Sequence, residues 1–328
     1  MPERRITLRT IAQMAGVSET TASMCLNGKA KLYHISEETC QRLMEVIRRV
    51  NYQPNMNARA MARKRTDIIG YVMRGSVGAS FWAEILSGID QALATEGFHL
   101  LPIFIQDTLK AELEALDFLV AKGVDACIWV PICSADGKTN AKNVLKKHKK
   151  HLPIMTLTHL LEGFHGIEVD DDCGGVIAAK YLWDKGHRRI AVLGDDLLYF
   201  RSKACCNELR QRGVNPHCFP DLPSLMQCIR QFTAVFCFSD IQALALYKAL
   251  LQEGLKVPDD ISVVGYDNMF LSDMMTPALT TINQPKEEFG SQAGKYLLDI
   301  LDNPEQPIHQ MRIEPTLIER ASVRQIVE

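Results

Sequence analysis

The chain has 328 residues, of which 47% are hydrophobic and 23% are charged. This composition excludes a disordered chain and is sufficient for two or three packed units. The opening residues lack the apolar core of a signal peptide, and no run of about 18 apolar residues occurs, so we expect a cytoplasmic protein without a membrane span.

The net charge of −2 conceals a basic beginning and an acidic remainder. Residues 1–65 hold 12 of the 37 Lys and Arg residues but 5 of the 39 Asp and Glu residues, a balance of +7, and the rest of the chain carries −9. A small basic segment joined to a larger acidic body is typical of a polyanion-binding module attached to another domain.

The ten cysteines form no CxxC pair and no repeated interval. Zinc sites and disulfide frameworks have such spacing, so we expect neither. Most of these cysteines should be reduced and buried, where they act as small hydrophobic residues. We expect no metal and no cofactor.

Three short helices are predicted in the first 52 residues. Thr7 can cap a helix that Gly16 ends, and Ser18 can cap a second helix after a turn of only two residues. Ser36 starts a third helix, whose apolar residues predict a broad inward stripe: Cys40, Leu43, Met44, Val46, Ile47 and Val50. Two helices joined by a tight turn form a helix-turn-helix, whose second helix can enter the major groove of DNA.

The stretch after Pro54 is short, polar and basic, and we expect it to become helical only when bound. From Asp67 onward, apolar strands alternate with helical segments in two series. The first has strands in IIGYVM, FHLLPIFI, DACIWVPI and LPIMTLT, and the second has strands in GIEV, RIAVLG, AVFCF and ISVVGYD. Two sets of βαβ units predict two doubly wound lobes, with a ligand cleft at the carboxyl ends of their strands.

Four motifs, taken together and in order, resemble the LacI/GalR family of transcription repressors. They are TLRTIAQMAGVSETTASMCLNG, NYQPNMNARAMA, KGHRRIAVLGD, and VPDDISVVGYDN followed by PALTTINQP. The resemblance covers essentially the whole chain. Within the head, TTASxxxNGKAK is most similar to the fructose repressor (catabolite repressor-activator) branch.

This resemblance implies an α/β fold with an N-terminal three-helix helix-turn-helix head, a hinge helix and two parallel-sheet lobes of periplasmic-binding-protein-like type. The expected domains are the head at 1–52, the hinge helix or linker at 53–66 and the effector-binding and dimerisation body at 67–328. The N-lobe is expected at about 67–166 and 284–314, and the C-lobe at about 167–283 and 315–328. The implied partners are a palindromic double-stranded DNA operator, a sugar-like small-molecule effector and a second copy of the chain.

The resemblance places base reading on three residues of the second helix, namely Glu19, Thr20 and Met24. Met24 stands where an arginine of the lactose-repressor pattern forks onto guanine, a pair worth about 1–3 kcal/mol of discrimination. Methionine cannot form that pair, so we expect altered specificity. Glu19 either accepts a hydrogen bond from a cytosine amine or stabilises the helix start. Phosphate contacts are expected from Thr7, Thr21, Ser23, Asn27, Lys29, Lys31, Tyr33, His34 and Asn55.

In the linker, Met61 falls on the position from which the family pushes an aliphatic wedge into the central minor-groove step. Arg59 is expected to contact DNA close by. The alternative is that Met61 is an exposed linker residue.

Family ligand positions correspond to residues in both lobes. Arg201 can fork onto vicinal hydroxyls, a phosphate or a carboxylate, and Asp267 can accept hydrogen bonds from sugar hydroxyls. Each also has a structural alternative, because Arg201 can pair with an acid and Asp267 can cap a turn. Phe81 and Trp82 form either a stacking wall or core. The predicted ligand residues are Phe81, Trp82, Arg201, Ser239, Asp240, Asp267 and Gln284.

One departure from the family lies between Gly213 and Phe232, where this chain has only eighteen residues. The family usually has a longer segment there, with a strand and a full helix. The second lobe is therefore trimmed, and a changed or absent effector site is consistent with this shortening.

The sequence disfavours two other classes of function, a ligand carrier and an enzyme. A ligand carrier built from the same body would not need the +7 head. An enzyme would need a catalytic constellation, and the run Asp170-Asp171-Asp172 cannot point three side chains one way. No GxSxG, HExxH or Walker motif occurs, so we expect no catalytic residue. A dimer is favoured over a tetramer because no leucine heptads follow Val323.

Overall fold

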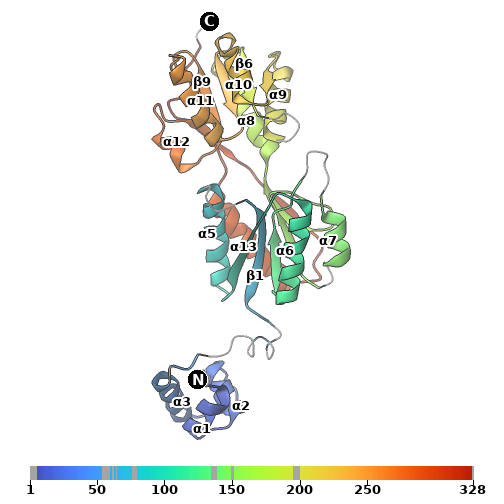
Figure 1. Ribbon diagram of the computed structural model, residues 1–328, viewed down its shortest axis with the longest axis vertical. Coiled ribbons are helices and arrows are strands. Elements are labelled where there is room, and N and C mark those ends of the chain that lie inside the picture. Colours follow the sequence, from blue (N-terminus) through green and yellow to red (C-terminus); the bar gives the residue numbers. More distant parts are fainter. Residues whose placement is uncertain are drawn as a thin grey trace. The chain divides into compact units, whose positions relative to one another are not determined.

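The structure is a computed structural model that describes residues 6–53, 60, 63, 65–75, 80–133, 139–148, 151–194 and 200–326. The chain separates into two compact units, Met1–Thr66 and Asp67–Glu328 (Figure 1). We call them the head and the body. Among the described residues, no helix combines the length and the apolar character needed to cross a bilayer.

The described part of the head contains three helices, α1 (Leu8–Ala15), α2 (Glu19–Leu26) and α3 (Glu37–Arg49). Thr7, Ser18 and Ser36 are their N-caps, and each side chain accepts a hydrogen bond from the backbone N–H three residues later at 3.0–3.3 Å. Gly16 ends α1 with a φ of 65°, a conformation that glycine adopts without steric cost. The predicted caps and the predicted stop are confirmed.

The core of the head joins all three helices through small and branched residues. Its buried members are Ile11, Ala12, Ala15, Ala22, Leu43 and Val46. Met44 does not belong to the core, because 43% of it is exposed. The prediction that placed Met44 in the inward stripe is wrong, since the 100° step of a helix turns it away from its buried neighbour Leu43.

Within the described residues, the body contains two six-stranded sheets. The first has the order β11-β5-β4-β3-β1-β2, and all of its neighbouring strands are parallel. Its strands are β1 (Ile68–Arg74), β2 (His99–Ile105), β3 (Ala126–Trp129), β4 (Ile154–Leu157), β5 (His165–Val169) and β11 (Gln310–Ile313). Its helices are α5 (Ser80–Ala94), α6 (Leu109–Lys122), α7 (Ala141–Lys147) and α13 (Lys286–Asp302). We call this sheet with its helices the first lobe.

The second lobe has the strand order β12-β10-β9-β8-β6-β7, in which only β12 runs antiparallel to its neighbour among the described strands. Its strands are β6 (Ile190–Leu193), β7 (His217–Phe219), β8 (Ala234–Cys237), β9 (Ser262–Asp267), β10 (Thr280–Asn283) and β12 (Thr316–Ile318). Its helices are α8 (Asp171–Asp184), α9 (Phe200–Gln211), α10 (Leu222–Met226), α11 (Asp240–Gln252) and α12 (Phe270–Met274), with a 3-10 turn at Ile229–Gln231. The predicted pair of parallel-sheet lobes is confirmed.

The strand GIEV was predicted in the second lobe but lies in the first. The GIEV segment belongs to β5, which pairs with β4 and β11 in the first sheet. The prediction that it opens the second series is wrong. An apolar strand pattern states that a segment is buried in a sheet but not which sheet it joins, because pairing depends on partners far away in sequence.

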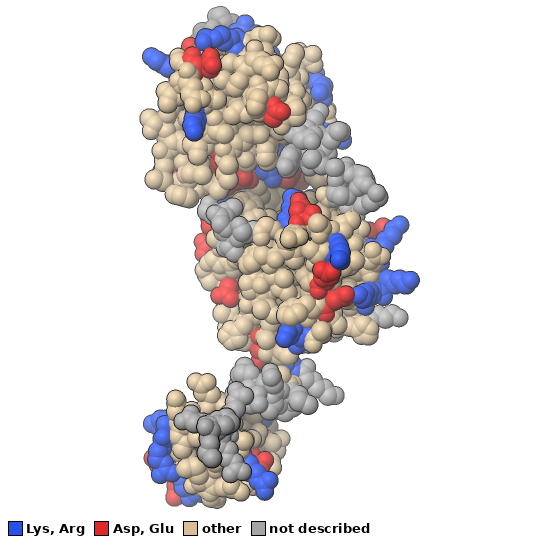
Figure 2. Space-filling view, in the orientation of Figure 1, with Lys and Arg blue, Asp and Glu red and all other residues tan. Residues whose placement is uncertain are grey.

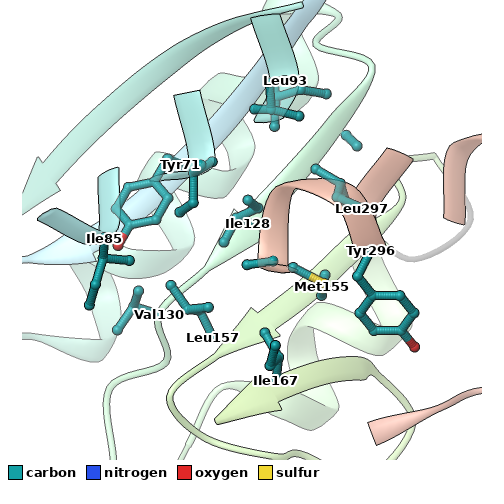
Figure 3. Packing of buried hydrophobic residues seen from close by; sticks show 14 of the residues in the cluster. Tyr71, Ile85, Leu93, Ile128, Val130, Met155, Leu157, Ile167, Tyr296 and Leu297 are labelled. Carbon is teal, nitrogen blue, oxygen red and sulfur yellow. The ribbon is translucent and has the colours of Figure 1, made fainter. Parts of the chain in front are cut away.

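The first lobe has a buried core on each face of its sheet, and one of them lies between the sheet and the helix pair α5 and α13. Figure 3 shows Tyr71, Ile85, Ile128, Leu157 and Leu297 converging in this layer. The two helices approach closely because Gly88 and Gly290 lie at their contact. A Cβ on Gly290 would overlap the carbonyl oxygen of Ile85, so glycine is required there by space.

Replacing Gly290 by alanine should destabilise the body by about 1–3 kcal/mol, because the added methyl group must push two packed helices apart. Urea unfolding followed by far-UV circular dichroism measures this loss. Lys295→Ala on the exposed side of the same helix is the control and should stay within about 0.5 kcal/mol of the wild type. Equal stability of both variants would contradict the close packing of α5 and α13.

Candidate functional site

Helix α2 presents a largely polar surface away from the core of the head. Of its described residues, only Ala22 is fully buried. Glu19 and Thr20 are exposed, whereas Thr21, Ser23, Met24 and Asn27 are partly exposed; in the loop that follows, Lys29, Lys31, Tyr33 and His34 are exposed. The predicted DNA contacts on α2 and this loop are thus all at least partly accessible, and their roles stay predictions. Asn55, Arg59 and Met61 lie outside the described residues.

Several of these side chains also form contacts within the head. Glu19 lies in the first turn of α2, where a carboxylate favours the helix, and its oxygen is 3.7 Å from Nε of Arg9. That pair is exposed and contributes little to stability. Asn27 donates to the backbone oxygen of Ser23 at 2.9 Å and accepts a hydrogen bond from Arg63 at 3.2 Å. Glu19 is thus placed to stabilise the start of α2, and its contact with a base stays a prediction.

A cluster of charged side chains forms in the second lobe around Arg201, at the start of α9. Its Nη1 donates to Asp267 Oδ1 at 3.0 Å and to the carbonyl oxygen of Phe238 at 3.1 Å. Its Nη2 lies 3.0–3.1 Å from both carboxylate oxygens of Asp171. The guanidinium carbon also lies 3.9 Å from the ring centre of Tyr266, whose hydroxyl donates to Asp171. We call Arg201, Asp171, Asp267 and Tyr266 the arginine cluster.

The arginine cluster forms where strands of the second lobe end. Asp267 is the last residue of β9, Phe238 follows β8, and Gln284 follows β10 and donates to Asp267 at 2.7 Å. The carboxyl edge of a parallel sheet is where α/β proteins place their ligand sites. Asp267 also has a φ of 100°, an uncommon backbone conformation for a residue with a side chain, which is typical of functional sites.

Burial controls the charges of the arginine cluster. It raises the pKa of Asp267 to about 6, although Arg201 and the Gln284 side chain favour the charged form. Burial lowers the pKa of Arg201, but Asp171 and Asp267 more than offset this, so the guanidinium stays charged. Asp267 is therefore expected to change its charge near pH 6.

A buried lysine connects the arginine cluster with the first lobe. Lys286, at the start of α13, is only 4% exposed, and its Nζ donates to the carbonyl oxygens of Asp267 and Asn268 at 2.8 and 3.0 Å. The same ammonium lies 3.5 Å from a carboxylate oxygen of Glu84 on α5. The turn that carries Asp267 is thus tied to a helix of the other lobe.

The acidic run at 170–172 is divided between two roles. Asp170 caps α8 by accepting a hydrogen bond from the N–H of Cys173 at 2.9 Å, whereas Asp171 points to Arg201. Sequence reasoning missed Asp171 as a member of the site and weighed it only as part of a catalytic cluster. The open alternative in which Arg201 pairs with an acid is observed, and its partners are Asp171 and Asp267.

Two of the predicted ligand residues have structural functions. Ser239 caps α11 by accepting from the N–H of Gln242 at 3.2 Å. Asp240 has no exposed surface, and its carboxylate accepts hydrogen bonds from the N–H of Met269 and the hydroxyls of Ser272 and Thr281. The prediction that Asp240 contacts a ligand is therefore not supported, since three donors already occupy it inside the lobe.

The predicted aromatic pair lies on α5 of the first lobe. Phe81 and Trp82 stack edge to face with ring centres 5.2 Å apart. Both rings are partly buried against the core of the first lobe, as the alternative of a core role for Phe81 and Trp82 predicts. Their contact with a ligand stays a prediction.

The shortened segment between Gly213 and Phe232 keeps the strand of the family pattern but little of the helix. It contains β7, the five-residue helix α10 and the 3-10 turn. Leu225 and Ile229 of this segment are buried against the second sheet. The trimmed lobe therefore still closes its core.

A helix-turn-helix is a DNA-binding motif, and the carboxyl ends of parallel strands are where α/β proteins place their ligand sites. The head and the two lobes therefore define a class of two-part proteins that combine these features. Residues 7–55 match the model for bacterial regulatory proteins of the lacI family. Residues 66–204 match the model for periplasmic binding proteins and the sugar-binding domain of the LacI family, and residues 179–323 match a periplasmic binding protein-like domain.

Similar proteins span the whole chain. The transcriptional repressor PurR of Vibrio campbellii is 30% identical over 342 residues, covering 98% of this chain and 99% of the relative, and PurR of Histophilus somni is 30% identical over 337 residues, covering 97% and 99%. The chain therefore belongs to the LacI family of bacterial regulatory proteins. Its fold matches the Lac repressor dimer bound to operator and the anti-inducer ONPF, with a TM-score of 0.86 at 24% identity over 98% of this chain and 100% of the other.

A solved structure with a sugar is also similar. The LacI family regulator of Enterococcus faecium with bound ribose has a TM-score of 0.68 and 25% identity, covering 79% of this chain and all of its own.

The carboxyl group of Asp267 should titrate near pH 6, and Arg201→Met should raise its pKa further, because burial would then act without the neighbouring cation. Carbon-13 NMR of aspartate-labelled protein measures both values, with Asp267→Asn assigning the signal. Because the folded pKa lies above the unfolded value, this group should reduce stability as pH rises from about 4 to about 6. Titration of Asp267 near pH 4 would contradict its burial in the cluster.

Proposed function

We propose that this protein is a sequence-specific DNA-binding transcription regulator, acting as a repressor, that binds a palindromic operator as a homodimer. The observation that carries the proposal is the capped helix-turn-helix head, whose α2 leaves its polar side chains accessible, within a chain that matches repressors over its whole length. The Lac repressor, with the same fold, is a dimer bound to operator. We propose a cytoplasmic location as well, because a regulator of this kind acts where the bacterial chromosome lies.

The other two classes of function fit less well. A ligand carrier would need the body alone, and it would leave the basic head unexplained. An enzyme is disfavoured because Asp170 is used as a helix cap and Asp171 is paired with Arg201, and because the relatives are repressors. We therefore propose no catalytic role.

We propose that Glu19, Thr20 and Met24 read bases, with phosphate contacts from Asn55 and the other accessible head residues. Arg59 and Met61 would act in the minor groove. The sequence TTASxxxNGKAK supports a further proposal, that operator recognition follows the fructose repressor branch. The partly exposed Met24 offers an apolar contact, which suits a thymine methyl group and not guanine.

We propose that the arginine cluster binds a neutral ligand with hydroxyl groups, a sugar or a sugar derivative. Two carboxylates face one guanidinium, so the cluster carries excess negative charge when Asp267 is ionised and would repel a phosphate or a carboxylate. Carboxylates accept hydrogen bonds from hydroxyls without such repulsion. Among the described residues, Nε of Arg201 is buried without a hydrogen-bond partner, a donor that would gain a partner if a ligand or water oxygen entered the cluster. The ribose complex of the related regulator supports this class.

We propose that the homodimer forms through an apolar face on α11 and α12, which we call the α11–α12 face. It consists of large side chains that are 45–78% exposed, namely Ile241, Leu244, Leu251, Phe270 and Met274. On α11 these lie three and seven residues apart, on one side of the helix. Figure 2 shows few charged side chains over these helices. Exposed apolar side chains gathered in this way mark protein interfaces.

Selection from a library of random palindromes should yield one operator that the purified chain binds far more tightly than scrambled DNA at physiological salt. Met24→Arg should increase preference for guanine at one position of each half-site by roughly 5- to 150-fold, the range of about 1–3 kcal/mol for a bidentate contact. Gel shifts with single-base variants measure it.

Met44→Arg is the matched control, because it adds the same charge to an exposed position of α3. It should leave the base preference unchanged. Equal affinity of the wild type for operator and scrambled DNA would refute sequence-specific regulation.

Leu251→Lys should shift the chain toward monomer and weaken its dimer by at least about tenfold, because it places a charge in an apolar contact. Sedimentation velocity over a dilution series measures the dissociation constant. Phe118→Lys, at a half-exposed position of α6 in the first lobe, is the control and should remain dimeric. Unchanged dimerisation of Leu251→Lys would place the interface elsewhere.

A further inference from the structure

Two cysteine side chains of the second lobe touch across the contact between α9 and the edge strand β7. The sulfur atoms of Cys206 and Cys218 lie 2.8 Å apart. Ordinary non-bonded contacts are about 3.5–4.0 Å between carbon atoms, and sulfur is larger. We propose that Cys206 and Cys218 are a modification site, a dithiol that a low-molecular-weight disulfide converts reversibly into an intramolecular disulfide.

Cys206 and Cys218 come from two elements, α9 and β7, that pack against the same core of the second lobe. Cys206 is fully buried on the inner side of α9, beside Leu209. Cys218 lies on β7, where it pairs in register with Val192 of β6 and packs against the same core. Because β7 is the last strand of the sheet, Cys218 is partly exposed while its partner is not.

The neighbouring cysteines have other surroundings. Cys205 is as fully buried as Cys206, and burial and the nearby Cys218 both raise its pKa, so the sulfur–sulfur contact and not burial distinguishes Cys206. The thiol of Cys228 points to the carbonyl oxygen of Leu225 at 3.6 Å. Among the described residues of this lobe, the sulfur–sulfur contact in hydrogen-bonding range is that of Cys206 with Cys218.

The reaction is a double thiol–disulfide exchange. The thiolate of the more accessible Cys218 attacks the small disulfide, which forms a mixed disulfide and releases one small thiol. The Cys206 thiolate then attacks Sγ of Cys218, the mixed disulfide breaks, and the second small thiol leaves. Two protein thiols are oxidised, one small disulfide is reduced to two thiols, and the two protein protons end on those thiols. An excess of the small thiol reverses both steps.

The bond would fix the helix that carries Arg201. Helix α9 begins at Phe200, so its first turn holds the guanidinium of the arginine cluster and its second holds Cys206. A link to β7 ties this helix to the sheet and closes a loop of about a dozen residues, which stabilises a folded chain by restricting the unfolded one. The expectation of reduced cysteines would then hold for this pair only while the small thiol is in excess.

The test equilibrates the full chain with set ratios of reduced and oxidised glutathione and traps free thiols with N-ethylmaleimide. Trypsin separates 204–210, with Cys205 and Cys206, from 213–230, with Cys218 and Cys228. Mass spectrometry should find these peptides joined, with a loss of two hydrogens, as oxidised glutathione increases. The melting temperature of the oxidised chain should rise by roughly 5 °C over the reduced chain.

Four variants locate the bond. Cys206→Ser and Cys218→Ser should lose both the joined peptides and the rise in melting temperature, whereas Cys205→Ser and Cys228→Ser should keep both. Cys25 and Cys40 of the head also form a thiol contact, and their oxidation could change the melting temperature. Cys206→Ser keeps that pair, so the difference between the wild type and this variant reports on Cys206 and Cys218 alone.

Three results would overturn the proposal. The first is an absence of joined peptides at every ratio in the wild type, which does not depend on any variant folding. The second is a mixed disulfide on Cys218 that never resolves, because it would show that Cys206 cannot reach it. The third is joined peptides that persist in Cys218→Ser.

Discussion

The second lobe depends on one buried cation held between two carboxylates. Arg201 contacts Asp171, Asp267 and the carbonyl of Phe238, so one guanidinium joins the start of α8, the end of β9 and the loop after β8. Taking these charges out of water costs free energy, and only their mutual attraction offsets it. The pKa of Asp267, raised to about 6, shows that burial is not fully offset for that carboxyl group. A site with this residual imbalance can gain from a ligand that supplies further hydrogen bonds.

The same cluster has a physical route to the other lobe. Lys286 holds the backbone of the turn at Asp267 and lies beside Glu84, on a helix packed closely against α13. A ligand that moved Asp267 would therefore change the surroundings of Lys286 and the position of α5 relative to the second lobe. Regulation by lobe closure needs contacts of this kind, which differ between two arrangements of the lobes.

Sequence alone predicted the features that arise from local chemistry. Thr7, Ser18 and Ser36 were predictable as caps because a hydroxyl bonds an amide three residues later, whatever the rest of the fold does. The arginine cluster was predictable only in part. Asp171 and Asp267 lie far from Arg201 in sequence, and only strand order brings them together. The sheet that β5 joins, the burial of Asp240 and the contact of Cys206 with Cys218 depend on tertiary packing for the same reason.

A double-mutant cycle on the free energy of unfolding at pH 7.5 tests the role of the buried cation most directly. Arg201→Met should destabilise the body by about 3–5 kcal/mol, because it leaves two carboxylates buried without their cation. Adding Asp267→Asn should recover a substantial part of that loss, because it removes one of the stranded charges. If Arg201→Met costs less than about 1 kcal/mol, or if the second substitution recovers nothing, the pair does not organise the lobe.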